Sequence, residues 1–335
     1  MEIMSYINII FFLILNTFIY IIVDKYKKSY LKFLIDVPDK KRKLHNKPTF
    51  IIGGVFVAIY LIFYITHNLI FDNNYLLAIL ISSLAIFLIG VYDDYIQIGP
   101  YRKLFFLSLI IFIAVYFDDK LIISNLYFST FNKTLYLGKY SYFITILCML
   151  LLINSLNLSD GINGLAVGIS IIWTVYLIIN AQNIILNFLI PFLFLLVILF
   201  FNIYKGNFFL GDNGTLILST LIGLNIILLY NLKLNHDEFR ISAENIFILF
   251  FIPGVDMFRL FILRLLNKRD PFSGDRNHLH HLLISKFSLK KTLITYFSFM
   301  ILLLLFDYFK IIASFYLILL AFATYFFLVF ALRKI

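Results

Sequence analysis

The feature that most constrains this chain is a succession of apolar segments, each long enough to cross a lipid bilayer. Of its 335 residues, 62% are hydrophobic and 14% are charged, whereas a soluble domain is nearer half apolar and a quarter charged. A water-soluble fold could not bury this much apolar surface, so a bilayer must solvate most of it. The sequence therefore predicts an all-α polytopic membrane protein.

About eleven segments are candidates for transmembrane helices, because each supplies most of the roughly 20 apolar residues that a span needs. They lie at 3–23, 50–70, 75–92, 104–117, 141–156, 164–180, 184–203, 214–230, 244–263, 292–309 and 311–332. The first lacks a basic start and a small-residue cleavage site, so we interpret it as a retained helix and not a signal peptide. We see no repeat or linker, and expect one integral-membrane domain over residues 1–335.

The distribution of Lys and Arg predicts the orientation, because cytoplasmic loops carry an excess of these residues. With the 24–49 loop placed in the cytoplasm, 22 of the 28 basic residues lie on that side. We therefore expect the N-terminus outside and the C-terminus in the cytoplasm. Loop charge of this kind also accounts for the net charge of +10 without nucleic acid as a partner. On the outer side, residues 118–140 alternate in a way that suits a short hairpin or an interfacial segment.

Two clusters of acids and amides lie at cytoplasmic helix ends. Asp93 and Asp94 close the third span, and adjacent acids can bind a divalent cation or divide the roles of base and anion. In NSLNLSDGINGLAVG, the residues Asn154, Asn157 and Asp160 recur every three positions, so a helix end would put them on one face. Amides and a carboxylate beside exposed N–H groups suit a nucleotide or a phosphate. Taken alone, each cluster also fits a solvated turn.

Two further clusters follow on the same side. In GNFFLGDNGT, Asp212 sits in a glycine-rich turn where it could hold Mg²⁺ while phosphates supply other oxygens, or could simply cap a helix. The stretch PGVDMFRLFILRLLNKRDPFSGDRNHLHHLL gathers His278, His280 and His281 among several arginines. Clustered histidines also suit Zn²⁺, but the nearby carboxylates and glycines favour contact with a diphosphate. The basic residues up to and including Lys47, the lysine of KPT, suit either phosphate or anionic lipid.

In their order along the chain, these motifs resemble the polyprenyl-phosphate N-acetylhexosamine-1-phosphate transferases, the WecA/TagO/MraY-like family. The landmarks are KxHxKPT…GG, Asp93–Asp94 with Lys103–Leu104 downstream, NxxNxxDGxxGLAxG, GDNG and DRxHLHH. They cover about residues 36 to 285. The resemblance implies an MraY-like fold with an active-site cleft on the cytoplasmic face of the bacterial inner membrane.

The resemblance also implies a reaction and roles for the residues. A sugar-1-phosphate would pass from a UDP-N-acetylhexosamine to undecaprenyl phosphate, UMP would leave, and Mg²⁺ or Mn²⁺ would assist. Asp212 and Asp94 would bind the metal. The catalytic residues would be Asp93, Asp94, Asp212, His280 and His281. The substrate-binding residues would be Lys47, Thr49, Lys103, Asn154, Asn157, Asp160, Asn163, Arg264, Asp275, Arg276 and His278. Membrane lipid is a further expected partner, and the sequence leaves open whether the protein forms a homodimer.

The sequence departs from the family pattern at four places, and two of these indicate which sugar the donor carries. Asn163 stands where a second acid is common, and Phe50 where a proline often follows KPT. Gln97 replaces the lysine of the muramyl-pentapeptide branch, and DRNHLHH replaces its HHHFE form. Both differences favour a simple N-acetylhexosamine such as GlcNAc, with a phospho-MurNAc-pentapeptide transferase as the alternative. A transporter is a further alternative, but its ionisable groups would lie near the bilayer midplane. A catalytically inactive relative is the third.

Overall fold

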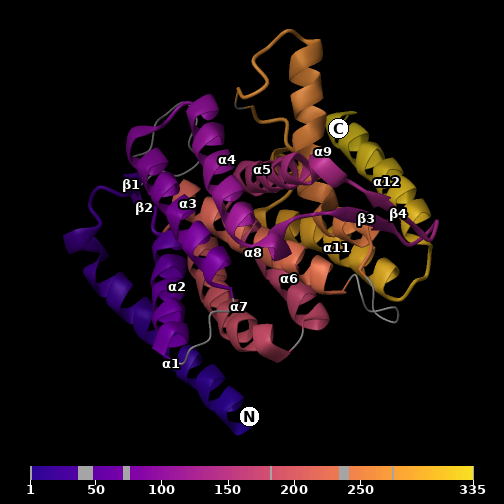
Figure 1. Cartoon of the computed structure of the whole chain (residues 1–335). Coiled ribbons are helices and arrows are strands. Elements are labelled where there is room, and N and C mark those ends of the chain that lie inside the picture. The colour runs from indigo at the N-terminus through magenta and orange to yellow at the C-terminus, as the bar shows by residue number, and fades with distance from the viewer. Residues whose placement is uncertain are drawn as a thin grey trace. The chain divides into compact units, whose positions relative to one another are not determined.

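The computed structural model describes residues 2–36, 48–70, 76–181, 183–233, 241–273 and 275–334. The chain divides into two compact units. The first unit comprises Met1–Asp118 and Ala166–Ile226, and the second comprises Asp119–Leu165 and Ile227–Ile335. Figure 1 shows the elements of both. Each unit is described separately below.

The first unit is helical apart from one short strand pair. In chain order its elements are α1 (Glu2–Tyr30), β1 (Ile35–Asp36), β2 (Thr49–Phe50), α2 (Gly53–Ile70), α3 (Leu77–Ile96), α4 (Pro100–Phe117), nearly all of α6 (Leu165–Asn180), α7 (Asn183–Tyr204) and the first part of α8 (Gly211–Lys233). The strands β1 and β2 pair antiparallel, with Asp36 opposite Thr49.

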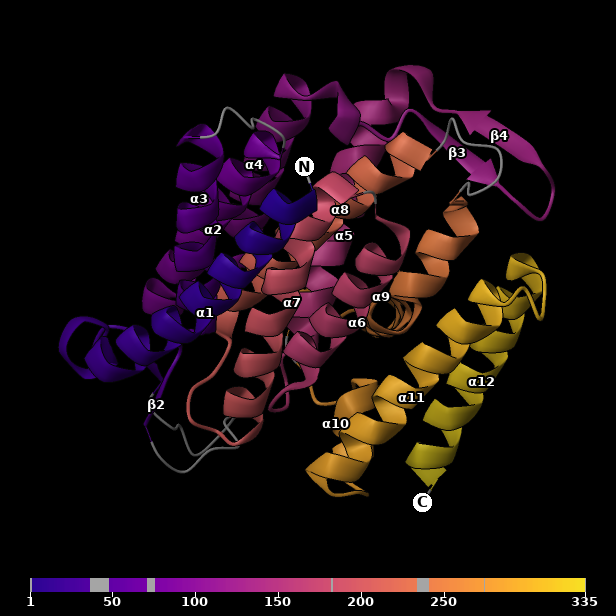
Figure 2. The ribbon, with the colours of Figure 1, turned by 90° about the horizontal axis from the view of Figure 1, so that it is seen from below.

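The second unit combines a hairpin with a helical bundle. Its elements are the 3₁₀ turn η1 (Asp119–Leu121), β3 (Asn125–Phe128), β4 (Lys133–Tyr136), the 3₁₀ turn η2 (Gly138–Tyr140), α5 (Ser141–Ser159), the end of α8, α9 (Ala243–Leu266), α10 (Leu279–Ile284), α11 (Leu289–Tyr308) and α12 (Ser314–Lys334). Figure 2 shows α11 and α12 side by side, with the short α10 at one end of the pair.

The helices confirm the prediction of an all-α polytopic membrane protein. Within the described ranges, nine helices are long and apolar enough to cross a membrane, and two shorter apolar helices cover Gly53–His67 and Leu165–Asn180. Each of the eleven predicted segments coincides with one of these helices. Because these two helices are short, a count of membrane spans from the sequence includes them only if it accepts apolar segments of fewer than 18 residues.

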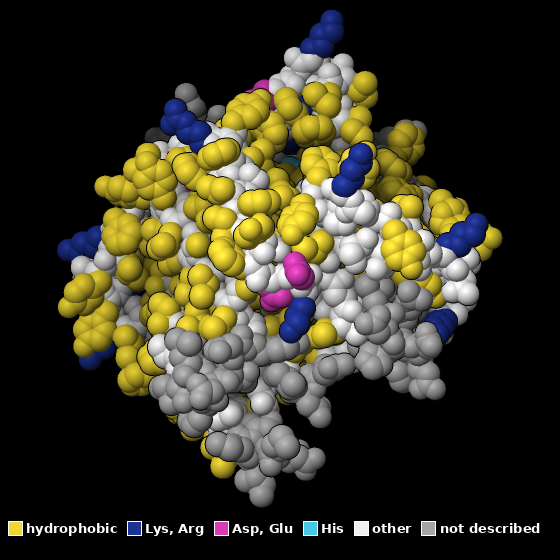
Figure 3. Space-filling model, in the orientation of Figure 1, with side chains coloured by type: hydrophobic (Ala, Val, Ile, Leu, Met, Phe, Trp, Pro, Cys, Tyr) yellow, Lys and Arg dark blue, Asp and Glu magenta, His cyan; other side chains and the backbone are white. Residues whose placement is uncertain are grey.

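Apolar side chains also cover the outer surface, as a lipid-exposed protein requires. Leu88 on α3 and Phe105 on α4 each expose more than 60% of their surface. In Figure 3 hydrophobic side chains spread over the face formed by α3 and α4. Because large exposed apolar patches are rare on soluble monomers, this surface is typical of contact with lipid tails.

Side-chain hydrogen bonds join α1 to α7, the two neighbouring helices visible in Figure 2. The buried amide of Asn16 donates to the carbonyl oxygen of Pro191 at 2.7 Å. Pro191 lies inside α7, where proline removes one backbone donor and disturbs the ladder of helical hydrogen bonds. Tyr60 of α2 donates to the carbonyl of Phe188 in the same helix. These bonds pair the Asn16 amide and the Tyr60 hydroxyl, polar groups that would be costly to leave without a partner within a membrane.

The predicted hairpin in 118–140 is confirmed as β3 and β4, which pair antiparallel. Its turn is held by the carboxylate of Glu244, which accepts hydrogen bonds from the backbone N–H groups of Ser129 and Thr130 at 3.0 and 3.2 Å. Glu244 lies in the first turn of α9, behind a capping box formed by Ser242 and Asn245. The hairpin is therefore anchored to a helix start and not left as a free loop.

Candidate active site

Asp212 lies in the first turn of α8, at the end of a tightly packed glycine turn. Gly211 has a φ of 72°, in the left-handed region that favours glycine, and a Cβ there would collide with the side chain of Ile51. On α3, a Cβ at Gly90 would come within 2.5 Å of the Cα of Asn213. The GDNG motif thus lets α8 begin directly against α2 and α3.

Asp94 fastens the start of α8 through its carboxylate. Its Oδ1 accepts from the backbone N–H of Asp212 at 3.0 Å, and its Oδ2 accepts from the backbone N–H of Asn213 at 2.8 Å. The Asn213 side chain also donates to Oδ2 at 2.5 Å. The first N–H groups of a helix have no partner within the helix and carry its positive dipole end, so a carboxylate is well placed there. Asp94 thereby fixes the position of Asp212.

Lys103 links the other two acids of this cluster. Its Nζ lies 2.8 Å from Oδ2 of Asp93 and 2.8 Å from Oδ2 of Asp212. The remaining oxygen of Asp93 accepts from the backbone N–H of Ile98 at 2.7 Å. Asp93 and Lys103 are largely buried, whereas the Asp212 side chain is 32% exposed. Of these three groups, Asp212 is therefore the most open to a ligand. We call Asp93, Asp94, Lys103 and Asp212 the acid cluster.

The KPT…GG segment reaches the acid cluster through backbone pairing. Phe209 accepts hydrogen bonds from the N–H groups of Ile52 and Gly53, and donates to the carbonyl of Phe50. Asn213 adds a bond to the carbonyl of Ile51 at 3.1 Å. Thr49, half-buried in β2, lies at the edge of this arrangement. Lys47 lies outside the described residues.

The donor set of the acid cluster fits a hard divalent cation. Among the described residues, no group of three or more His, Cys, Asp and Glu side chains is arranged to hold a metal ion. Mg²⁺ takes oxygen ligands and is commonly bound by only one or two protein carboxylates, with water and substrate phosphates completing its shell. The exposed carboxylate of Asp212 meets that requirement chemically.

In the second unit, the Asp160–Gly161 turn lies against the histidine motif. Asp160 follows α5 directly, and its N–H donates to the carbonyl of Asn157. A Cβ placed on Gly161 would collide with Nε2 of His280 and come within 2.9 Å of Nε2 of His281. Two motifs that are 120 residues apart in sequence thus meet, as expected for parts of one ligand site. We call Asp160, Gly161, His278, His280 and His281 the imidazole cluster.

The three asparagines of the same stretch have different surroundings. Asn154 donates to the carbonyl of Leu150 at 2.7 Å, one turn earlier in α5. Asn157 and Asn163 are half-buried on either side of the Asp160–Gly161 turn. Their roles in binding substrate stay a prediction.

Asp256, buried in α9, organises the start of the histidine motif. Its Oδ2 lies 2.8 Å from Nδ1 of His278, and both of its oxygens accept from the N–H of Leu279 at 3.1 Å. Arg259 donates to its Oδ1 at 2.9 Å, and the hydroxyl of Tyr325 does so at 2.5 Å. Because the buried carboxylate is surrounded by donors, it acts as an acceptor toward Nδ1. The proton of His278 therefore sits on Nδ1, and Nε2 is left for a ligand.

The other two histidines are neutral at neutral pH. Burial, together with the nearby His281 and His278, lowers the pKa of His280 well below its ordinary value. Burial, His278 and Arg276 lower the pKa of His281. Nε2 of His280 is buried with no hydrogen-bond partner in the described part of the chain. An unpaired buried nitrogen is costly, so it is well suited to meet a polar group of a ligand.

Arg264 and Asp275 shape the loop that precedes the histidines. Arg264 donates to Asp275 through Nε at 2.9 Å and to the carbonyl of Pro271 through Nη1 at 2.9 Å. Burial raises the pKa of Asp275, but hydrogen bonds from Asn277 and Arg264 outweigh it and lower the pKa overall. Arg276 is exposed.

Three important residues escaped the sequence analysis as members of the site: Asp256, Asn213 and Tyr325. For Asp256 a signal existed, because a carboxylate three residues before Arg259 interrupts an otherwise apolar helix. Asn213 lies within GDNG, next to Asp212, which is the residue that the motif singles out. Tyr325 carries no signal, since it is one of 22 tyrosines in the chain and lies in its last helix.

Comparison with known proteins agrees with the motifs. Residues 76–230 match the model of glycosyl transferase family 4. The chain is 28% identical over 256 residues to a probable undecaprenyl-phosphate N-acetylglucosaminyl 1-phosphate transferase of Bacillus subtilis, covering 75% of this chain and 70% of that protein. It is 28% identical to undecaprenyl-phosphate alpha-N-acetylglucosaminyl 1-phosphate transferases of Yersinia pestis and Escherichia coli K12, over 264 and 269 residues. Each alignment covers 75% of this chain and 69% of the relative.

Proposed function

We propose that the chain, whose residues 76–230 match glycosyl transferase family 4, transfers a sugar-1-phosphate from a UDP-sugar to undecaprenyl phosphate. A phosphate oxygen of the carrier attacks the β-phosphorus of the UDP-sugar. The bond between that phosphorus and the bridging oxygen breaks, and UMP leaves with the oxygen. The relatives' names favour N-acetylglucosamine as the sugar. The product is a lipid-linked sugar that initiates synthesis of a cell-envelope polysaccharide.

The observation that carries this proposal is the acid cluster at the start of α8. Phosphoryl transfer depends mainly on positioning and on neutralising the charge of the phosphates. Asp212 would hold Mg²⁺ together with Asp93 and not, as the resemblance implied, with Asp94, because both oxygens of Asp94 already accept from the start of α8. The metal would offset the charge of the diphosphate. Lys103 lies between Asp93 and Asp212 and offsets part of their negative charge, and Asp94 fixes the helix end that carries Asp212.

The imidazole cluster serves the same reaction in our proposal. His278 presents Nε2, because Asp256 occupies Nδ1. The neutral rings of His280 and His281 lie at the Asp160–Gly161 turn, where they would orient the sugar phosphate. Whether the carrier phosphate needs a base is secondary, since the second pKa of a phosphate monoester is near 6.

We further propose that this chemistry takes place on the cytoplasmic side of a bacterial inner membrane. The excess of Lys and Arg in the loops that carry the motifs supports that side. The carrier's polyprenyl tail can then stay in lipid while its phosphate reaches the interface. The catalytic groups at helix ends suit such a substrate.

The experiment is a UMP-release assay in proteoliposomes that contain undecaprenyl phosphate. We expect UDP-GlcNAc to give Mg²⁺-dependent UMP, and Asp212→Asn to reduce the rate by a hundredfold or more, on the order of the loss of a main electrostatic contributor. Asp24→Asn, which changes an acid in α1 paired only locally with Lys27, is the matched control. Equal rates for Asp212→Asn and Asp24→Asn would remove Asp212 from the mechanism. Turnover of UDP-MurNAc-pentapeptide in place of UDP-GlcNAc would favour the alternative reaction.

A further inference from the structure

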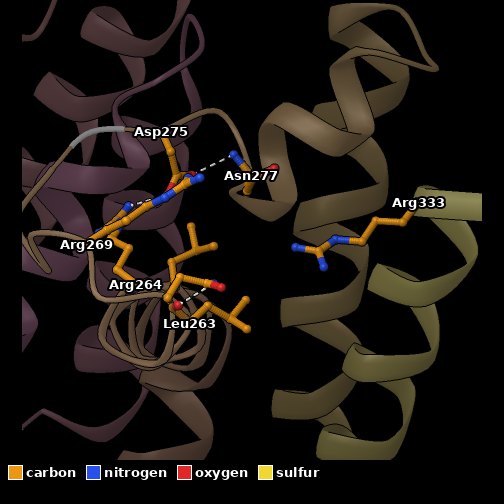
Figure 4. Close-up of a pocket in the computed structure, with 8 residues that line it drawn as sticks. Leu263, Arg264, Arg269, Asp275, Asn277 and Arg333 are labelled. Atoms are coloured by element: carbon orange, nitrogen blue, oxygen red, sulfur yellow. Dashed lines mark hydrogen bonds and ion pairs between the residues drawn. The ribbon is translucent and has the colours of Figure 1, made fainter.

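A cavity of about 440 Å³ opens in the second unit, at the carboxyl ends of α9 and α12. Its polar lining consists of Arg264, Asn267, Arg269, Asp275, Asn277 and Arg333, and we call it the arginine pocket. In Figure 4, Arg264, Arg269 and Asp275 lie together on one side, while Arg333 reaches toward them from α12. None of the acid or imidazole cluster lines it.

The arginine pocket carries more positive charge than its own acid can neutralise. Asp275 pairs with Arg264 at 2.8 Å. Within the described ranges, no carboxylate lies at salt-bridge distance from Arg269 or Arg333. Arginine in the last turn of a helix is often explained by the helix dipole, but Arg269 lies beyond the end of α9. The surplus charge therefore suits an anionic ligand.

The pocket is built on a fixed frame. Arg264 is buried, and its guanidinium is held by Asp275 and by the carbonyl of Pro271. Its own carbonyl accepts from the N–H of Arg269 at 2.9 Å, which fixes the backbone of the loop. A guanidinium group can bind two phosphate oxygens at once, so the side chains of Arg269 and Arg333 at one cavity are suited to a phosphate group.

The position of the pocket favours the phosphate of a lipid over a soluble phosphate. Two membrane-spanning helices end at it, because the spans Ala243–Leu266 and Ser314–Arg333 finish with its lining residues or just after them. Near the carboxyl ends of the same two helices, Leu266 is 74% exposed and Phe330 is 56% exposed. A ligand here would therefore have an anionic group at the arginines and an apolar body along the neighbouring helices.

We propose that the arginine pocket binds the phosphate of an anionic phospholipid at the membrane surface. Basic pockets between helices at the membrane surface recognise such head groups. The proposal does not depend on the transferase activity. It predicts binding of a lipid that is neither substrate nor product of the proposed reaction.

The test uses the full chain in a neutral detergent, titrated with phosphatidylglycerol or phosphatidylcholine and followed by native mass spectrometry. We expect phosphatidylglycerol to bind more tightly than the zwitterionic lipid. The double substitution Arg269→Gln with Arg333→Gln should weaken its binding by roughly tenfold or more, given about a factor of five for each surface cation. The double substitution Lys268→Gln with Lys286→Gln is the matched control, because it removes two positive charges from exposed residues of the same unit that do not line the pocket.

Each possible outcome of the titration either supports or contradicts binding of a lipid phosphate in the arginine pocket. Equal binding of phosphatidylglycerol by the arginine double variant and by the control with Lys268→Gln and Lys286→Gln would overturn the proposal. Competition with inorganic phosphate and with UDP-GlcNAc tests the two soluble sources. If either displaced the lipid, and its own binding were lost in the arginine double variant, the pocket would be a soluble-anion site and the assignment to lipid would be wrong. Unchanged lipid binding in their presence, with loss only in the arginine double variant, supports it.

Discussion

Oδ2 of Asp256 lies 2.8 Å from Nδ1 of His278, and this contact joins the middle of α9 to the first residue of the histidine motif. Asp256 also receives the N–H of Leu279, at the start of α10. The buried carboxylate of Asp256 thus positions the backbone where α10 begins and determines which ring nitrogen of His278 carries the proton. Asp256 is therefore a positioning residue, although no substrate need touch it.

Substituting Asp256 by Asn should separate that positioning role from general stability. Asn keeps the size of the side chain, but its NH₂ group is a hydrogen-bond donor. It would face two other donors, the guanidinium of Arg259 and the Nδ1–H of His278. We expect kcat to fall by about ten- to a hundredfold, the usual range for a residue that orients a ligand-binding side chain. The apparent Tm should also fall, because a buried charge loses its partner. The measurement is steady-state UMP release beside a thermal unfolding curve.

Two further variants show which effect belongs to His278. Asp270→Asn changes an exposed acid of the same unit, and both kcat and Tm should stay at the wild-type level. Tyr325→Phe removes one donor to Asp256 while leaving the contact with His278, so its kcat should lie close to wild type. A loss of kcat in Tyr325→Phe as large as in Asp256→Asn would argue against orientation of His278 as the cause.

Lys103 should be essential because it lies between two acids. Replacing it with Met leaves Asp93 and Asp212 without the cation that holds them 2.8 Å from Nζ on either side. We expect at least a hundredfold loss of UMP release, and partial recovery with Arg, whose guanidinium keeps the charge but not the shape. The adjacent exposed Arg102, changed to Met, should retain its activity. Equal losses in both variants would instead point to a general charge effect.

The contact between Gly161 and the imidazoles gives a steric prediction. Gly161→Ala would place a methyl group against Nε2 of His280 and 2.9 Å from Nε2 of His281, so the rings must move. A displacement of about 1 Å in a catalytic group can cost about a hundredfold in rate. Gly99→Ala is the matched control, because nothing lies within 4 Å of its added Cβ. UMP release is the readout, and full activity of Gly161→Ala would show that the rings are not held at this turn.

Acid should destabilise the protein through His280 and His281. The pKa of each is lowered in the folded state, so above the ordinary value of 6.5 neither state carries the extra proton. As the pH falls below 6.5, the unfolded chain binds protons that the folded chain refuses, and stability is lost. The apparent Tm should therefore fall between pH 7 and pH 5.5, and fall less in His280→Gln. An identical slope in the variant would contradict the burial of a neutral His280.

The helices and motifs were predictable because local sequence determines them. The length of the apolar segments predicts the membrane spans. The alternating pattern of residues 118–140, interrupted by turn residues, predicts the β3–β4 hairpin. The grouping of Asp93 and Asp94 with GDNG, and of Asp160 with the histidines, followed from motifs shared with a family. The structure brings each of these groups together within its own unit.

What escaped prediction depends on contacts across long stretches of chain. The family resemblance placed Asp94 with Asp212 at the metal and left open which acid of the DD pair acts as a base. In the structure, Asp94 accepts from the backbone of α8 with both oxygens, while Asp93 pairs with Lys103. Likewise, no periodicity could reveal that Tyr325 donates to Asp256, 69 residues earlier. Hydrogen-bond partners of buried polar groups are set by tertiary packing, which a single sequence does not display.

The most direct test of the central claim follows the β-phosphorus of the donor. Wild-type protein in undecaprenyl phosphate proteoliposomes would receive UDP-GlcNAc labelled with radioactive phosphorus at the β position. Transfer of a sugar phosphate moves that label into the lipid fraction, and the nucleotide released is unlabelled UMP. Release of labelled UDP, or of labelled inorganic phosphate with no labelled lipid, would contradict the account.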